Sequence, residues 1–151
     1  MTVVVYAVDR LTKWWVLAAL ADGQPRQVVG TLVQLRLLHN SGAAFSMGAG
    51  STWFFTAVSA AMSVAILVSL RRLREPRWTL ALGALLGGAL GNLTDRLLRP
   101  PGFGVGEVVD FIAVQRFAVF NVADSAIVLA CIAMFLLSLR GIEYDKDVAR
   151  G

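Results

Sequence analysis

The chain has 151 residues, of which 57% are hydrophobic, and a mean hydropathy of +0.68. A soluble globular domain is about 45–50% apolar and spreads its charges, whereas the charges here lie in short bands between long uncharged runs, which excludes an ordinary soluble domain. The formal net charge is +4, and its arginines stand beside apolar runs, which favours the basic inner loops of a membrane protein over nucleic-acid binding.

The first 21 residues are mostly apolar but contain Asp9, Arg10 and Lys13. A signal peptide carries its charge before the apolar stretch and not inside it, so we exclude one. If the chain starts inside and Ser51 lies outside, this segment must cross the membrane. We therefore predict a first span over residues 1–21, with a short inner end and its polar residues toward the outer side.

Three further apolar segments approach the roughly 20 residues that a helix needs to cross a bilayer core, and we predict spans over residues 51–70, 78–98 and 120–139. Four arginines between residues 71 and 77 place that loop in the cytoplasm, because cytoplasmic loops are rich in basic residues. The charged tail 141–151 is then cytoplasmic as well, and we expect it to have no fold of its own.

Two loops on the outer side contain extended segments. Leu32–Leu37 partly alternates apolar and polar residues, as a half-buried strand does, and Asn40-Ser41-Gly42 follows as a turn. After the Pro/Gly-rich loop Pro100–Gly106, Val108–Val119 is a second short extended or interfacial piece. The predicted fold class is an all-α membrane protein, in which a four-transmembrane-helix bundle of residues 1–140 carries a small extracytoplasmic β element.

Acidic residues gather at one membrane level. Placing an ionisable group inside a span costs roughly 2.5–3.5 kcal/mol of insertion free energy, so such a group is expected to have a structural or functional role. Asp9, Asp95 and Asp124 lie within predicted spans. Asp110 lies between spans but has only apolar neighbours. By the predicted topology all four lie toward the outer side, although they come from distant parts of the sequence.

The third predicted span combines small and polar residues. Its glycines recur every four residues, which lets a neighbouring helix approach closely: Gly83, Gly87 and Gly91. Gly88, Asn92 and Asp95 share one helix face, so the two polar side chains point into the bundle or a wet cavity. Three roles for Asp95 stay open. It could hydrogen-bond a neighbouring helix while Arg96 neutralises its charge, it could position the substrate, or it could take part directly in the chemistry.

Two other acidic residues also have structural interpretations. Asn121 is suited to be a helix N-cap with Asp124 three residues later, as in a capping box, so capping competes with catalysis there. Asp9 and Lys13 are four residues apart, which is the spacing of an ordinary helical ion pair.

The chemistry that needs only two aspartates is aspartyl proteolysis. Two nearby carboxylates cannot both ionise easily, so the pKa of one rises. The ionised member takes a proton from water, and the protonated member donates to the scissile carbonyl oxygen. The chain has no HExxH or GxSxG motif, and the lone Cys131 and His39 can build no metal cluster. We therefore expect neither a metal nor a cofactor.

Four segments, in this order, resemble those of the bacterial lipoprotein signal peptidase (signal peptidase II) family. They are Asp9–Lys13 (DRLTK), Asn40–Ser46 (NSGAAFS), Gly87–Arg96 (GGALGNLTDR) with Val108–Ile112 (VVDFI), and Phe120–Ser125 (FNVADS). The resemblance covers the chain from about Val8 to Leu139, and the four-span layout matches too. The loop Leu97–Glu107, with its Pro100-Pro101-Gly102, is longer than is usual in the family.

The resemblance implies an endopeptidase that removes signal peptides from prolipoproteins, cutting before a diacylglyceryl-modified cysteine. It implies that Asp110 and Asp124 are the catalytic pair. Residues that bind the substrate or support the pair would be Asn40, Gly42, Asn92, Asp95, Arg96 and Asn121. Asp9 and Lys13 would brace the first helix. The implied setting is the bacterial cytoplasmic (inner) membrane with the active site on the extracytoplasmic side, and the implied partners are the lipidated prolipoprotein and membrane lipids; we expect a monomer.

Three alternatives come from other classes. A small transporter or proton-conducting protein would need an acidic path through the membrane, whereas the acids here cluster on one side. An intramembrane protease of the Gly-x-Gly-Asp type is excluded, because the nearest match, Gly104–Glu107, ends in Glu and lies in a loop. A structural membrane subunit without activity would require every buried aspartate to serve only helix packing.

Overall fold

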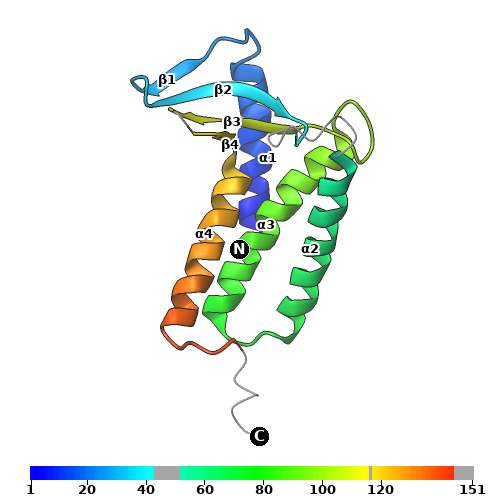
Figure 1. Cartoon of the computed structure of the whole chain (residues 1–151), viewed down its shortest axis with the longest axis vertical. Coiled ribbons are helices and arrows are strands. Elements are labelled where there is room, and N and C mark those ends of the chain that lie inside the picture. Colours follow the sequence, from blue (N-terminus) through cyan, green and yellow to red (C-terminus); the bar gives the residue numbers. More distant parts are fainter. Residues whose placement is uncertain (43–51, 116, 145–151) are drawn as a thin grey trace, which may run out of the picture.

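The computed structural model describes residues 1–42, 52–115 and 117–144, so part of the Asn40–Ser46 segment and most of the predicted tail lie outside the described residues. The helices are α1 (Thr2–Ala19), α2 (Thr52–Arg72), α3 (Pro76–Leu98) and α4 (Val122–Leu139). The strands are β1 (Arg26–Val29), β2 (Val33–Asn40), β3 (Val108–Val114) and β4 (Val119–Phe120), which pair in that order as an antiparallel sheet. The sheet lies across one end of the helices (Figure 1).

Two of the helices meet the requirements for crossing a membrane by length and composition. The apolar windows of α2 and α4 have mean hydropathies of 2.0 and 2.3, yet only 17% and 11% of their residues are buried. A core helix of a soluble protein would be mostly buried. The exposed apolar surface of α2 and α4 therefore suits contact with lipid.

Helix α1 is polar inside and apolar outside. Its buried residues, Asp9, Lys13 and Val16, are spaced to lie on one face. Its other faces expose large apolar side chains such as Val3 and Trp14. In a soluble protein a helix buries its apolar face, whereas α1 buries charged residues and exposes apolar ones. A helix with three central charges can therefore lie at the edge of an apolar bundle.

The glycines of α3 permit close packing on two sides, as their spacing predicts. A Cβ atom on Gly87 would lie 2.7 Å from the carbonyl oxygen of Thr2 in α1. A Cβ on Gly88 would lie 2.6 Å from the carbonyl oxygen of Ala123 in α4. Helix α3 thus lies between α1 and α4, and a separate apolar cluster joins it to α2 and α4: Ile66, Leu82, Leu85, Leu86 and Ala130.

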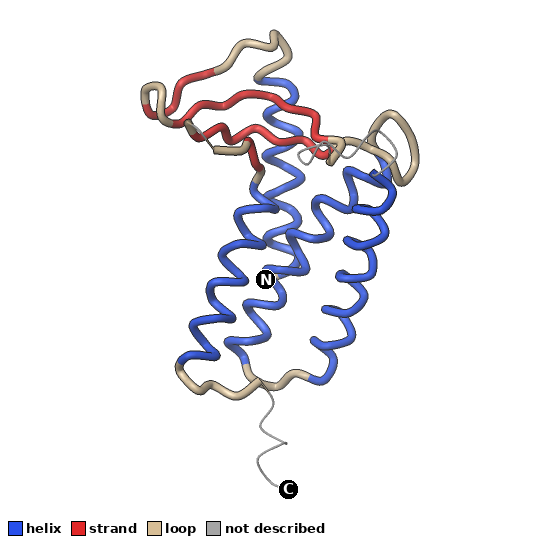
Figure 2. The backbone as a smooth tube through the Cα atoms, viewed as in Figure 1, coloured by secondary structure: helices blue, strands red, loops and turns tan. Residues whose placement is uncertain are grey.

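The start of α1 lies beside Gly83 of α3, so α1 covers only the part of α3 that is nearer to the sheet. Figures 1 and 2 show the N-terminus about halfway along the bundle, with α3 and α4 continuing beyond it.

The sheet joins the two extended segments that the sequence indicates separately. Strand β2 pairs with β3 in a register that sets Leu38 opposite Asp110 and Asn40 opposite Val108. Beneath the sheet, the end of α1 packs against β3 through a buried apolar cluster: Val16, Leu20, Val109 and Phe111. Pairing with β2 and packing on α1 together fix the position of β3, and therefore of Asp110, over the helix ends.

Candidate active site

Asp110 lies in β3 and is almost completely buried, with 1% of its surface exposed. Its two carboxylate oxygens accept hydrogen bonds from the side-chain amides of Asn40 (2.8 Å) and Asn121 (2.7 Å). The pKa of Asp110 is raised to about 6, chiefly by burial; the negative charge of Asp124 adds to this rise, and the hydrogen bonds from Asn40 and Asn121 oppose it. The pair predicted from the sequence is therefore close enough to interact electrostatically.

Asp124 lies in the first turn of α4 and is half-buried. The predicted capping box is present: the Asn121 side chain accepts from the backbone N–H of Asp124 (2.9 Å), and Asp124 accepts from the backbone N–H of Asn121 (3.2 Å). The other carboxylate oxygen of Asp124 accepts from the Asn92 amide at 2.7 Å. Capping and a position beside Asp110 thus belong to the same residue.

Asn92 and Lys13 connect the aspartate pair to α1. The side-chain oxygen of Asn92 accepts from the Lys13 ammonium at 3.0 Å and from the Asn121 amide at 3.1 Å. The completely buried Lys13 also contacts carboxylates of Asp9 and Asp95, each at 2.9 Å. The other Asp9 oxygen accepts from the backbone N–H of Ala123, so Asp9 links α1 to the start of α4.

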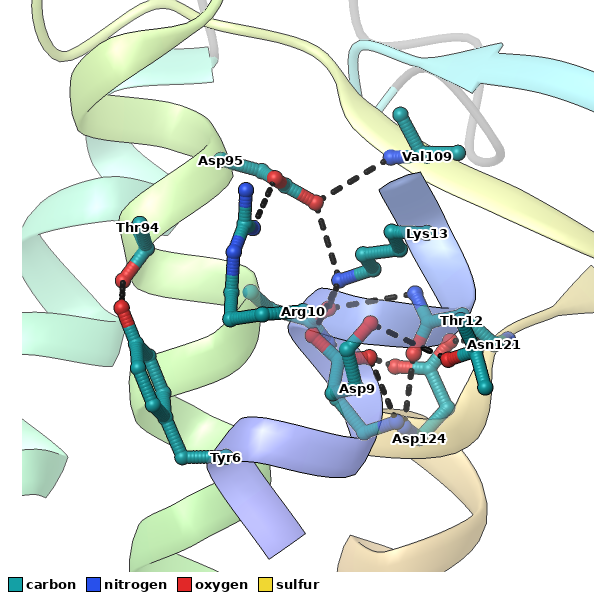
Figure 3. A network of polar contacts seen from close by, with 12 residues as sticks. Tyr6, Asp9, Arg10, Thr12, Lys13, Thr94, Asp95, Val109, Asn121 and Asp124 are labelled. Carbon is teal, nitrogen blue, oxygen red and sulfur yellow. Dashed lines mark hydrogen bonds and ion pairs between the residues drawn. The ribbon is translucent and has the colours of Figure 1, made fainter. Parts of the chain in front are cut away.

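Asp95 has two cationic partners that we did not predict from the sequence, Arg10 and Arg99. Besides Lys13, it binds Arg10 and Arg99, each at 2.5 Å (Figure 3 shows the Arg10 and Lys13 contacts). The i,i+4 spacing of Asp95 and Arg99 is a signal for that pair, whereas Arg10 comes from another helix and only the fold brings it near. Arg96, which we expected to neutralise Asp95, forms no ion pair with it among the described residues, where the ion pairs of Asp95 are these three.

Arg96 lies instead against α2. Its guanidinium carbon is 5.7 Å from the ring centroid of Phe55. The same ring covers Gly42, where a Cβ atom would come within 2.8 Å of it, and Gly42 has φ +90, which favours glycine. The Gly42 backbone N–H donates to the Asn40 side chain at 2.8 Å, forming the expected turn. Because Asn40 also binds Asp110, this turn orients a partner of the aspartate pair.

The arrangement places two carboxylates, one on the sheet and one at a helix start, around a single asparagine. The Asn121 side chain donates to Asp110, and its backbone N–H donates to Asp124. One carboxylate with a raised pKa beside a more accessible one is the arrangement that acid–base chemistry on an amide bond needs. Of the residues predicted for the site, Asn40, Asn92 and Asn121 contact the pair directly, Lys13 contacts it through Asn92, and Gly42 contacts it through Asn40.

Comparisons with known proteins agree with this picture. A sequence model of the signal peptidase (SPase) II family matches residues 1–140. The chain is 48% identical to the lipoprotein signal peptidase of Leifsonia xyli subsp. xyli, over 93% of this chain and 66% of that protein. It is 49% identical to that of Rhodococcus jostii, over 94% of this chain and 72% of that protein.

The fold has a solved counterpart. A bacterial membrane enzyme structure matches with a TM-score of 0.80 at 28% identity, covering 91% of this chain and 89% of that one. This likeness, together with the exposed apolar helices, indicates an integral membrane protein. The match to a family of peptidases excludes the two alternatives of a transporter and of an inactive structural subunit. The chain belongs to the signal peptidase II family, the proteases that remove signal peptides from prolipoproteins.

Proposed function

We propose that the chain cleaves diacylglyceryl-modified prolipoproteins before the lipidated cysteine, with Asp110 and Asp124 as the catalytic pair. The observation that carries this proposal is the double engagement of Asn121, which hydrogen-bonds both carboxylates. A pair held by a shared donor keeps its geometry through the catalytic cycle, so little reorganisation is needed as the reaction proceeds.

The two aspartates differ in environment, and this difference supports the roles that we propose for them. Asp110 is buried and its pKa is raised to about 6, which favours its protonated form, and we assign to it the proton that is donated to the scissile carbonyl oxygen. Asp124 is more exposed and takes the proton from the attacking water. The water oxygen bonds to the carbonyl carbon; the C–N bond then breaks as Asp124 passes its proton to the leaving amine, and Asp110 regains its proton from the hydroxyl group as the carbonyl re-forms.

The supporting residues have separate tasks in this scheme. Asn40, Asn92 and Asn121 orient the carboxylates by hydrogen bonding. Gly42 and Arg96 lie around the Phe55 ring and contribute to the substrate surface. The Asp9–Lys13–Asp95 cluster braces α1 against α3.

The membrane arrangement follows from charge. We infer that all four helices of residues 1–140 cross the bacterial inner membrane, because the polar faces of α1 and α3 meet each other while their apolar faces point outward. Arg71 and Arg72 end α2 away from the sheet, so that end and the 141–151 tail face the cytoplasm. The active site then faces the extracytoplasmic side, where a monomer surrounded by lipid meets the lipid-modified cysteine.

The test is cleavage of a purified diacylglyceryl-modified prolipoprotein by Asp110→Asn and Asp124→Asn. Each variant loses its proton donor or its base, and we expect activity to fall by at least about 10³-fold. Asp22→Asn is the matched control, because Asp22 is an exposed aspartate that pairs with Arg26 outside the site. It should retain normal turnover.

Full activity in either dyad variant, with the protein inserted and folded, would contradict the catalytic assignment. The same prolipoprotein without its lipid provides a second comparison. Equal cleavage of both forms would contradict the proposed requirement for a lipidated cysteine while leaving the dyad intact.

A further inference from the structure

Two asparagines of the aspartate site have side-chain orientations that the backbone fixes. The Asn40 oxygen accepts from the backbone N–H of Gly42 at 2.8 Å. The Asn121 oxygen accepts from the backbone N–H of Asp124 at 2.9 Å. A backbone N–H can only donate, so it selects the oxygen of each side-chain amide and leaves the NH₂ group for the other side. On that other side, both NH₂ groups donate to Asp110.

For Asn92 a charged side chain from another helix has the corresponding position. Asn92 lies inside α3, where the backbone N–H groups are taken up by the hydrogen bonds of the helix itself. Its side-chain oxygen accepts from the Lys13 ammonium at 3.0 Å and from the Asn121 amide at 3.1 Å. An ammonium is also a donor only. The NH₂ group of Asn92 is thereby left for Asp124, to which it donates at 2.7 Å.

Bracing of α1 against α3 does not by itself account for this lysine. The Lys13 ammonium lies between the carboxylates of Asp9 and Asp95, at 2.9 Å from each (Figure 3). Arg10, also from α1, forms another ion pair with Asp95, so the two helices are linked without Lys13. What Lys13 adds is the contact with Asn92, one hydrogen bond away from the aspartate pair.

We propose that Lys13 is a positioning residue for the catalytic pair, an inference that rests on the function proposed above. It holds the Asn92 oxygen, so that Asp124 always meets the NH₂ group of Asn92. A carboxylate that accepts such a bond is favoured in its ionised form, because that form is an acceptor only. The ionised form is the one that takes a proton from water. Lys13 thus acts on the reaction through Asn92 and without contact with the substrate.

Lys13→Met tests this role, because methionine keeps the length of the side chain and removes its donors and charge. We expect kcat for the lipidated prolipoprotein to fall by about 10-fold to 100-fold, the effect of one hydrogen bond to a charged group. KM should stay within about twofold, because Lys13 is completely buried and lies behind Asn92.

Arg10→Met is the matched control, since it removes another cation of α1 that pairs with Asp95 and leaves the Asn92 contact in place. It should lower the melting temperature while kcat stays within about threefold of the unmodified protein. Equal losses of kcat in Lys13→Met and Arg10→Met would overturn the proposal, because the bracing of α1 would then explain both.

A double-mutant cycle shows whether Lys13 acts through Asn92. If it does, Lys13→Met/Asn92→Ala should have a kcat within about threefold of Asn92→Ala alone. Effects of the two substitutions that multiply would overturn the proposal. They would leave the catalytic pair untouched if Asp110→Asn and Asp124→Asn are inactive in the same assay.

The cycle can also be measured if Lys13→Met does not fold. The lost ammonium leaves Asp9 with a buried charge, so the same comparison is then made in an Asp9→Asn background, which removes that charge. The side-chain oxygen of asparagine can still accept from the backbone N–H of Ala123, as Asp9 does. The same two outcomes, no further loss or multiplied losses, decide the proposal in this background.

Discussion

At the residue scale, structural and catalytic interpretations of the same side chain prove compatible. The sequence sets capping against catalysis at Asp124, yet the capping box and the link to Asp110 share Asn121. A cap fixes the first turn of α4 by satisfying backbone N–H groups. That same fixation holds the Asp124 carboxylate at Asn121, which also binds Asp110, so the local structural role serves the proposed chemistry.

Lys13 shows why a charged residue can lie inside this bundle. Its ammonium has three oxygen partners, contributed by Asp9, Asp95 and Asn92, and its side chain is completely buried. A buried charge is tolerated when it is paired and hydrogen-bonded. The ordinary i,i+4 pair expected from the sequence is thus one part of a larger cluster that joins α1 to α3.

The protonation of Asp110 gives a pH prediction at this scale. The donor must be protonated and its pKa is raised to about 6, so kcat/KM should fall as pH rises above about 6, approaching tenfold per pH unit. The measurement is kcat/KM for the lipidated prolipoprotein from pH 5 to pH 8. The melting temperature over the same range separates lost protonation from unfolding. A flat profile with a constant melting temperature would show that Asp110 is not the proton donor.

At the element scale, the packing of α3 sets the position of the site. Asn92 on α3 and Asp124 on α4 hydrogen-bond across an interface where Gly88 lies against Ala123. Small residues at such interfaces let helix backbones approach closely. At this short separation, short polar side chains such as those of Asn92 and Asp124 can hydrogen-bond from one helix to the other.

Gly88→Ala tests this dependence. The added Cβ would lie 2.6 Å from the carbonyl oxygen of Ala123 and 2.8 Å from Cγ1 of Ile127, so the helices must separate. We expect a loss of about 1–3 kcal/mol in stability, seen as a lower melting temperature, together with weaker cleavage as the Asn92–Asp124 bond lengthens.

Gly102→Ala is the matched control for this substitution. Its Cβ would meet only Cγ2 of Val105, at 3.8 Å, which is an ordinary van der Waals distance. Its melting temperature and activity should match those of the unmodified protein. Equal behaviour of the two variants would contradict the claim that close α3–α4 packing positions the site.

At the scale of the whole molecule, the two ends differ in chemistry. One end has the sheet, the aspartate pair and the buried Lys13 cluster, whereas the other has Arg71, Arg72 and Arg77. This asymmetry predicts the orientation in the membrane through the excess of basic residues on the cytoplasmic side.

Cysteine labelling tests the orientation. In a Cys131→Ser background, Gln27→Cys places a thiol on the exposed strand β1 and Glu143→Cys places one after α4, at the other end. A membrane-impermeant maleimide added to intact bacterial spheroplasts should label only the Gln27→Cys protein, and both after lysis. Labelling of the Glu143→Cys protein alone in intact spheroplasts would reverse the proposed orientation.

The sequence by itself determined the helices and the family, and through the family resemblance it proposed the aspartate pair. Long apolar runs bounded by charge predict helices because lipid and buried surfaces favour them, and the starts at Thr52 and Val122 lie within two residues of the predicted spans. The Asn121–Asp124 capping box was predictable because both partners lie within one helical turn. The motifs Val108–Ile112 and Phe120–Ser125 indicated the proposed pair through their resemblance to the signal peptidase II family.

Only the tertiary structure decided which distant groups meet. The pairing of β2 with β3, which brings Asn40 to Asp110, depends on register between segments 70 residues apart. The contact of Arg10 with Asp95 depends on the rotation and depth of α1 against α3, which no spacing along one helix reveals. Such contacts are set by packing between elements, and for that reason they were visible only in the folded chain.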